Sequence, residues 1–222
     1  MILRKIFCVG FHKTGTTSLA EYYNLTGMAA CHWPTVVAGV DHEATCARLW
    51  DDPAGLLRQL QPVIDAFDVH SDVPWPGLVN ELVTEFPDAL FILSVRDPAS
   101  WWNSLEAHWA LRVRSHTLSP YERAQYRRYL TDVTRPFSRS DRDQLMVAYR
   151  QHNEHVRKTV PSERLLDVRI DDPGIAGRLA SFAGTNPSVP FPIAQPRPAS
   201  MVKALRRALR ARRNDRRFGP GQ

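Results

Sequence analysis

A short segment near the N-terminus combines two glycines, a lysine and several hydroxyl side chains in an order that suits phosphate binding. Gly10 and Gly15 have the spacing of the glycines in a P-loop, and Lys13 lies between them. Such a loop directs successive backbone N–H groups at one point, and the N-terminus of the following helix adds positive potential. We therefore expect a phosphate site whose other members are His12, Thr14, Thr16, Thr17 and Ser18.

The loop differs from that of the nucleoside triphosphatases. Their pattern needs a lysine directly after the second glycine, whereas this chain has Thr16 there and carries its lysine at Lys13. This difference argues against a P-loop nucleotide kinase or hydrolase, which would also need Mg²⁺ and an aspartate at a strand end. We keep that class of enzyme as an alternative. A non-catalytic protein that binds through a basic tail is a third reading, and it leaves the phosphate loop unexplained.

A second anion-binding pair is predicted further along the chain. Arg96 ends a strongly apolar run at 89–95, and Ser104 follows it at a spacing of eight residues. An arginine at the carboxyl end of a strand points into the ligand crevice of an open α/β sheet, where its guanidinium can hold a phosphate bidentately. Two separate anchors suit a ligand that carries two phosphate groups.

Alternating strands and helices must position these residues. Short apolar runs predict strands at 5–10, 67–72, 89–95 and 164–170, and helical spacing with cap signals predicts helices at 16–24, from 53, at 77–86, at 98–108 and at 174–184. This alternation is typical of an α/β fold with a central parallel sheet covered by helices, like that of the P-loop nucleoside triphosphatases. Between about 106 and 160 the sequence is polar and without a clear strand, so we expect a helical insertion there.

The loop Lys13-Thr14-Gly15-Thr16-Thr17, followed by the Arg96 and Ser104 pair, resembles the sulfotransferases that use 3′-phosphoadenosine 5′-phosphosulfate (PAPS). The likeness covers most of 5–192 and includes His32-Trp33-Pro34 and Pro190-Phe191-Pro192. It implies that the loop binds the 5′-phosphosulfate of PAPS and that Arg96 and Ser104 bind the 3′-phosphate. The product nucleotide would be 3′,5′-adenosine bisphosphate (PAP), and no metal would be needed.

The resemblance also implies roles in catalysis. Lys13 would stabilise negative charge on the departing phosphate, and a base would accept the proton of the attacking group. Many relatives have a histidine two residues before a proline at this strand end, whereas the matching segment 69–74 has Asp72 there. Asp72 is therefore the favoured base and His70 the alternative. The acceptor would be a hydroxyl or an amine of a small molecule or glycan, and the sequence specifies neither it nor an oligomeric state.

The positive charge of the chain is concentrated at its C-terminal end. The 222 residues carry a formal net charge of +6, while the stretch 203–217 alone contains eight basic residues and one acid. The remainder is close to neutral, so the charge does not indicate that the whole protein binds nucleic acid. We expect one domain over 1–200 and a basic tail over 201–222. The tail is predicted to be solvated, with contact to an anionic surface as the alternative.

Cysteine use and hydrophobicity indicate a compartment. The three cysteines, Cys8, Cys31 and Cys46, are odd in number and lack the spacing of a metal site. They favour a reducing environment, so we expect a cytoplasmic protein. The apolar run at 6–11 is too short for a signal peptide or a membrane span, and no transmembrane segment is expected.

Overall fold

Five parallel strands form the centre of the molecule. The computed structural model describes residues 4–33, 36–112 and 141–192. Within these, the sheet has the order β2 (Ala30–His32), β5 (Val69–Ser71), β1 (Ile6–Cys8), β6 (Leu90–Val95) and β7 (Leu165–Arg169). All four neighbouring pairs are parallel. The predicted α/β fold with a central parallel sheet is therefore confirmed.

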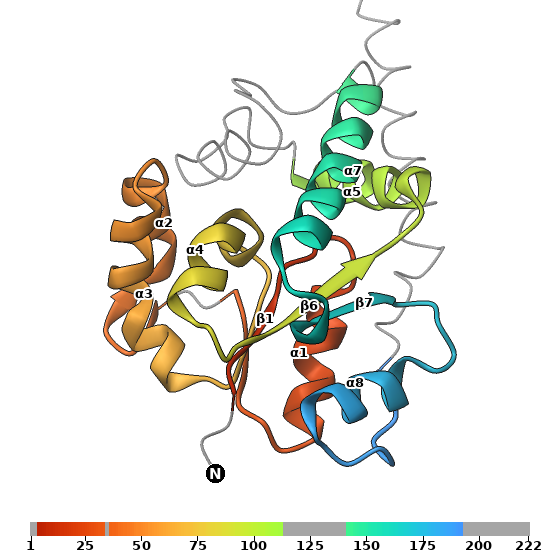
Figure 1. The fold of residues 1–222 in the computed structure, drawn as a ribbon. Coiled ribbons are helices and arrows are strands. Elements are labelled where there is room, and N and C mark those ends of the chain that lie inside the picture. The colour runs from red at the N-terminus through yellow and green to blue at the C-terminus, as the bar shows by residue number, and fades with distance from the viewer. Residues whose placement is uncertain (1–3, 34–35, 113–140, 193–222) are drawn as a thin grey trace, which may run out of the picture. The chain divides into compact units, whose positions relative to one another are not determined.

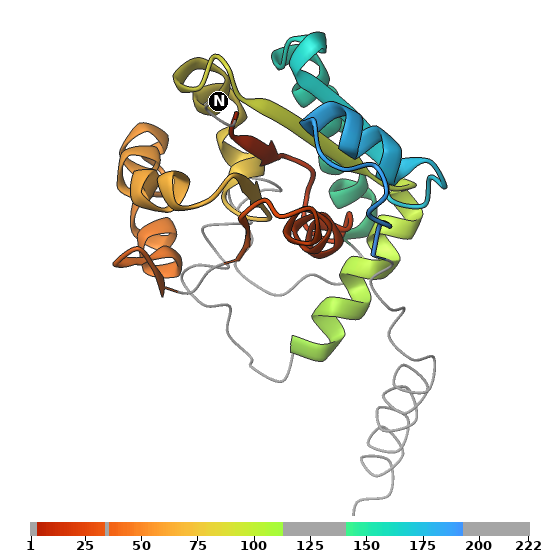
Figure 2. The ribbon, with the colours of Figure 1, turned by 90° about the horizontal axis from the view of Figure 1, so that it is seen from below.

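Helices cover both faces of this sheet (Figures 1 and 2). Side chains alternate along β1, so that Phe7 packs into one hydrophobic cluster and Ile6 and Cys8 into another. The Phe7 cluster is completed by α2 (His42–Leu49), α3 (Pro53–Ala66), α4 (Val79–Glu85) and α7 (Arg142–Thr159). The opposite cluster is completed by α1 (Thr16–Leu25) and α8 (Ile175–Ala183). A sheet buried on both faces explains why its strands are continuous apolar runs.

Local signals start the helices where the sequence predicts. The carboxylate of Asp52 accepts the N–H of Gly55 at 2.9 Å, and Pro53 occupies the first turn of α3. Asp97 does the same for the N–H of Ser100 at 2.9 Å, where α5 (Pro98–Arg112) begins. A short 3₁₀ helix at Trp75–Leu78 precedes α4, and another at Ser162–Arg164 precedes β7. These caps fix the points at which the chain leaves the strand ends.

Three parts of the fold were not predicted from the sequence. These are the edge strand β2, the hairpin of β3 (Val36–Val37) and β4 (Val40–Asp41), and the helix α2 into which the hairpin leads. The expected insertion is helical where it is described: α5 and α7 pack together through Trp101 and Tyr149, whose rings stack at 4.5 Å. The middle of the insertion and the predicted tail at 201–222 lie outside the described residues.

The cysteines and helices bear on the predicted compartment. Cys8, Cys31 and Cys46 are all buried free thiols. Burial raises the pKa of the Cys8 thiol to about 12, so that it remains protonated and unreactive. Among the described helices, none has the length and apolar character needed to cross a bilayer.

Candidate active site at the carboxyl ends of the strands

The predicted phosphate loop leaves the carboxyl end of β1, the central strand, and enters α1. After β1 the chain runs to β2 and β5 on one side of this strand, and it then crosses to β6 and β7 on the other side. Open α/β sheets bind their ligands at such a point. The loop therefore lies where the fold places a ligand crevice.

Backbone conformation and close packing give the loop its shape. Lys13 and Gly15 adopt left-handed conformations with φ of 70° and 96°. A Cβ on Gly10 would collide with the backbone and hydroxyl of Ser94, and one on Gly15 would meet Ile170. Both glycines are thus required by the close approach of neighbouring elements, and the second is also favoured by its backbone angle.

Buried hydrogen bonds hold the loop on the side of β6. The Thr14 hydroxyl donates to the Phe11 carbonyl at 2.5 Å and lies 2.7 Å from the Ser94 hydroxyl, and both side chains are fully buried. Farther along, the Trp101 indole N–H donates to the His12 carbonyl at 3.1 Å. We name these contacts, together with that of Arg96 below, the β6 side of the loop. None of its partners was predicted except Arg96.

Arg96 belongs to the same side. Its guanidinium Nη1 donates to the Lys13 carbonyl oxygen at 3.2 Å, and its backbone N–H donates to the Tyr149 hydroxyl at 2.8 Å. The Tyr149 hydroxyl in turn donates to the Arg96 carbonyl at 3.2 Å. The structure thus brings the Arg96 guanidinium to the backbone of the loop. Ser104 lies on α5 and is partly exposed.

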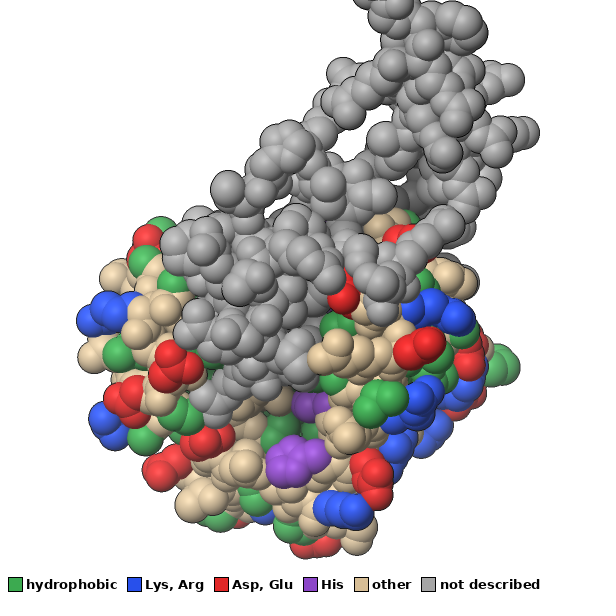
Figure 3. All heavy atoms as spheres, turned by 90° about the horizontal axis from the view of Figure 1, so that it is seen from above, with side chains coloured by type: hydrophobic (Ala, Val, Ile, Leu, Met, Phe, Trp, Pro, Cys, Tyr) green, Lys and Arg blue, Asp and Glu red, His purple; other side chains and the backbone are tan. Residues whose placement is uncertain are grey.

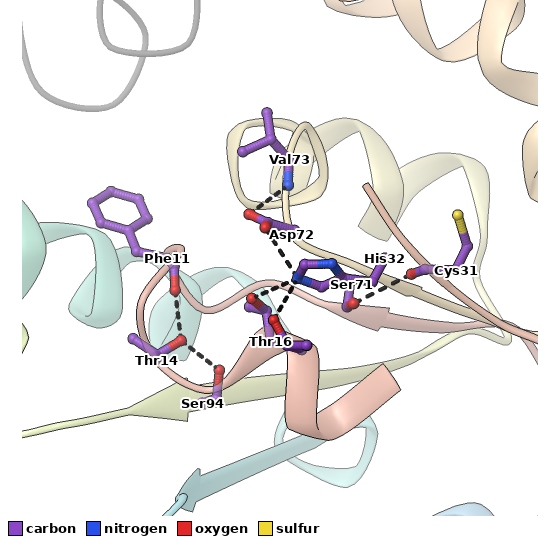
Figure 4. A network of polar contacts seen from close by, with 10 residues as sticks. Phe11, Thr14, Thr16, Cys31, His32, Ser71, Asp72, Val73 and Ser94 are labelled. Carbon is purple, nitrogen blue, oxygen red and sulfur yellow. Dashed lines mark hydrogen bonds and ion pairs between the residues drawn. The ribbon is translucent and has the colours of Figure 1, made fainter. Parts of the chain in front are cut away.

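The opposite wall of the loop is built around His32, at the end of β2. Its Nε2 atom lies 3.2 Å from three oxygens: the hydroxyls of Thr16 and Thr17 and Oδ2 of Asp72. Figure 4 shows the imidazole between the start of α1 and the chain segment that follows β5. We name this group the β2 side. It is partly open to solvent, with 26% of the His32 side chain and 13% of the Asp72 side chain exposed.

The charge state of Asp72 follows from its surroundings. Burial by itself raises the pKa of this carboxyl group, but the hydrogen bond and positive potential of His32, the potential of His12 and the backbone N–H of Val73 outweigh it. The net result is a pKa below the ordinary value for aspartate, so Asp72 is ionised at neutral pH. Its φ of 72° shows that the chain leaves the extended conformation here and turns the carboxylate toward the loop wall.

His70 occupies a different environment. It is fully buried in the hydrophobic core, stacked on Phe7 at 5.0 Å and tilted against Trp75 at 4.9 Å. Burial and the positive charge of Lys5 lower its pKa to about 3. Of the two predicted candidates for the base, the structure therefore places Asp72 beside the loop and His70 inside the protein.

Sequence reasoning missed His32 as a site residue, and also Ser94 and Trp101. His32 belongs to the family-like segment after the first helix, whereas nothing in the spacing of Ser94 or Trp101 indicates the loop. Viewed down onto the strand ends, histidine and hydrophobic side chains meet at the surface of this face (Figure 3). The described residues contain no group of three or more His, Cys, Asp or Glu arranged to hold a metal ion.

Comparison with known proteins agrees with this geometry. The model of the sulfotransferase domain matches residues 5–199. The Ava biosynthesis cluster protein M of Aspergillus versicolor is 26% identical over 182 residues, with 73% of this chain and 70% of that protein covered. A sulfotransferase from Alicyclobacillus acidocaldarius is similar in fold: its crystal structure has a TM-score of 0.53 at 18% identity, covering 95% of this chain and 91% of its own. Because the domain match spans most of its length, the chain belongs to the sulfotransferase family.

Proposed function

We propose that the protein transfers a sulfuryl group from PAPS to a hydroxyl or amine of a small-molecule or glycan acceptor. The observation that carries this proposal is the loop between β1 and α1, shaped by Gly10 and Gly15 and joined by the Arg96 guanidinium. Membership in the sulfotransferase family supports the reaction class.

The residues present fit the donor. The loop packs closely against Ser94 and Ile170, where neither Gly10 nor Gly15 has room for a Cβ, and it leads into the N-terminus of α1, which favours an anion. His12 to Ser18 would hold the 5′-phosphosulfate of PAPS. Arg96 and Ser104 would hold the 3′-phosphate, since a guanidinium and a hydroxyl are suitable donors for phosphate oxygens.

During the reaction, negative charge develops on the departing 5′-phosphate, and the acceptor loses one proton. When the acceptor oxygen or nitrogen bonds to sulfur, the bond between sulfur and the bridging oxygen breaks, and its electron pair remains on the 5′-phosphate of PAP. Lys13 would stabilise that charge. Asp72, ionised at neutral pH, would take the acceptor proton. Its lowered pKa makes it a modest base, which suits an acceptor that loses its proton late in the transfer.

Ligand-dependent unfolding tests the proposal without knowledge of the acceptor. At a concentration 100 times its Kd, PAP should stabilise the native state by about 2.7 kcal/mol, and this should raise the melting temperature by roughly 5–10 °C. ATP with Mg²⁺ should have little effect. A larger shift with ATP and Mg²⁺ than with PAP would instead support a P-loop kinase or hydrolase.

Lys13→Ala tests the chemical step. Loss of one preorganised group that stabilises developing charge typically lowers turnover by about 10²–10³-fold. Release of PAP from labelled PAPS, with an extract of the source organism supplying acceptors, would measure this loss. The control is the unligated melting temperature, which the substitution should leave nearly unchanged because Lys13 is only half-buried. Turnover within a factor of two of the wild type would exclude the assigned role.

A further inference from the structure

One nitrogen atom on the β2 side has three oxygen neighbours. Nε2 of His32 is equally distant, at 3.2 Å, from the hydroxyl oxygens of Thr16 and Thr17 and from Oδ2 of Asp72 (Figure 4). A neutral imidazole nitrogen either carries a proton and donates, or carries a lone pair and accepts. The identities of its three neighbours decide between these states.

The carboxylate of Asp72 requires that Nε2 of His32 carry a proton. An ionised carboxylate can only accept hydrogen bonds, so a lone pair on Nε2 at 3.2 Å would face another lone pair and repel it. The other oxygen of Asp72 already accepts the Val73 N–H at 3.0 Å, which orients the carboxylate. Asp72 therefore holds a proton on Nε2, whatever the state of the second ring nitrogen.

The proton on Nε2 also determines how the hydroxyls of Thr16 and Thr17 can interact with His32. A hydroxyl next to a protonated nitrogen can only accept from it, so neither Thr16 nor Thr17 can donate its own proton to His32. Each O–H proton is then directed elsewhere. Both residues are in the first turn of α1, where the helix N-terminus favours an anion.

We propose that His32 is a positioning residue that, held as an Nε2–H donor by Asp72, turns the Thr16 and Thr17 hydroxyl protons toward the anionic end of the donor nucleotide. The inference rests on the proposed function for the identity of that anion. The direction of the hydrogen bonds rests on the geometry and on the ionised carboxylate of Asp72. It gives Asp72 a second task, carried out through His32, in addition to that of a base.

Nitrogen NMR of the unligated protein tests the direction of the bonds. In protein labelled with ¹⁵N-histidine, Nε2 of His32 should resonate as a protonated nitrogen at neutral pH. In Asp72→Ala, part of the population should shift to the other tautomer, because the carboxylate no longer selects it. His32→Gln assigns the signal. A wild-type Nε2 without a proton would overturn the inference.

Substitutions of His32 test the consequence for binding. His32→Leu removes the donor and should weaken PAP binding about tenfold in calorimetric titration, whereas His32→Gln retains an N–H donor and should bind within about threefold of the wild type. A merely structural role predicts that both substitutions weaken binding alike. Equal losses in the two variants, at unchanged melting temperature, would therefore overturn the inference.

A double-mutant cycle connects His32 to the hydroxyls. Thr17→Val should weaken PAP binding several-fold in the wild type and hardly at all in His32→Leu, because the hydroxyl of that variant is no longer oriented. Thr17→Ser, which keeps the hydroxyl, is the matched control. Additive losses would contradict the coupling. If the wild type failed to bind PAP, the proposed function would fall, and the NMR measurement would still decide the inference because it needs no nucleotide.

Discussion

The phosphate loop is held differently on its two sides. On the β6 side, the contacts of Thr14 and Trp101 are buried and those of Arg96 are partly buried, and most of them end on backbone carbonyls, such as those of Phe11, His12 and Lys13. On the β2 side, the contacts join side chains, and His32 and Asp72 are partly exposed. Buried bonds to the backbone fix where the peptide groups lie, whereas exposed bonds between side chains set which groups donate and which accept. We infer that one side sets the shape of the loop and the other its polarity.

The largest effect is expected where the β6 side is tightest. In Gly10→Ala, the new Cβ would collide with the Ser94 backbone, which cannot move without displacing β6. Overpacking of this kind should lower the free energy of unfolding by about 3 kcal/mol. Chemical denaturation would measure it. Gly177→Ala is the matched control: this residue lies in α8 and its added Cβ would meet no atom within 4 Å outside the helix backbone, so the substitution should be stabilising by about 0.5–1 kcal/mol. An unchanged stability of Gly10→Ala would remove the distinction between the two sides.

Arg96 tests whether the β6 side has a role beyond shape. Removing a charged phosphate contact costs about 1.5–3 kcal/mol, so Arg96→Ala should weaken PAP binding by roughly ten- to a hundredfold. Adenosine 5′-phosphosulfate lacks the 3′-phosphate and should bind within about threefold of its wild-type affinity, because Thr14 and Trp101 still hold the loop. Calorimetric titration of both ligands compares the two. Equal losses would show that Arg96 acts by holding the Lys13 carbonyl.

The smallest effect on function is expected at His70. Its pKa is lowered to about 3 in the folded state, compared with about 6.5 when unfolded. Below pH 6.5 the unfolded chain binds the extra proton, so stability is complete above that pH and falls as the pH decreases toward the folded pKa. For this group, the loss between pH 7 and pH 5 is about 2 kcal/mol. His70→Phe should abolish that part of the loss and leave PAP binding at pH 7 unchanged.

Urea unfolding at the two pH values checks this prediction, with His155→Gln as a control because His155 is exposed on α7. The control should retain the full pH dependence. Loss of sulfuryl transfer in His70→Phe without loss of stability would make His70 a candidate for the base again. It would also place the base in the hydrophobic core and outside both sides of the loop.

Much of the fold could be predicted because its signals are local. An apolar run that ends in glycine gives β1, and an aspartate followed by proline gives the starts of α3 and α5. The loop could be predicted for the same reason, since its glycines, lysine and hydroxyls are contiguous. β2 could not, because a three-residue strand containing Cys31 and His32 is too short to show a period.

The walls of the site could not be predicted because they are formed across the sheet. The contact between His32 and Asp72 joins the ends of two neighbouring strands that are distant in sequence, and no pattern within either segment announces it. The burial of His70 has a similar origin. Strand alternation gives its face, but only the packing of Phe7 and Trp75 determines that this face is closed to solvent.

The order of the strands has a consequence for how the protein reaches its native state. Within the five-stranded sheet, each hydrogen-bonded strand pair joins segments that are far apart along the chain, with β1 at the centre. Such pairings form slowly, because each closes a long loop before its contacts can compensate for the lost entropy. The loop's supports come from β2, β5 and β6, so a partly assembled chain has no complete anion site. The ability to capture an anion thus arises only with the finished sheet, and capture would in turn draw the folding equilibrium toward it.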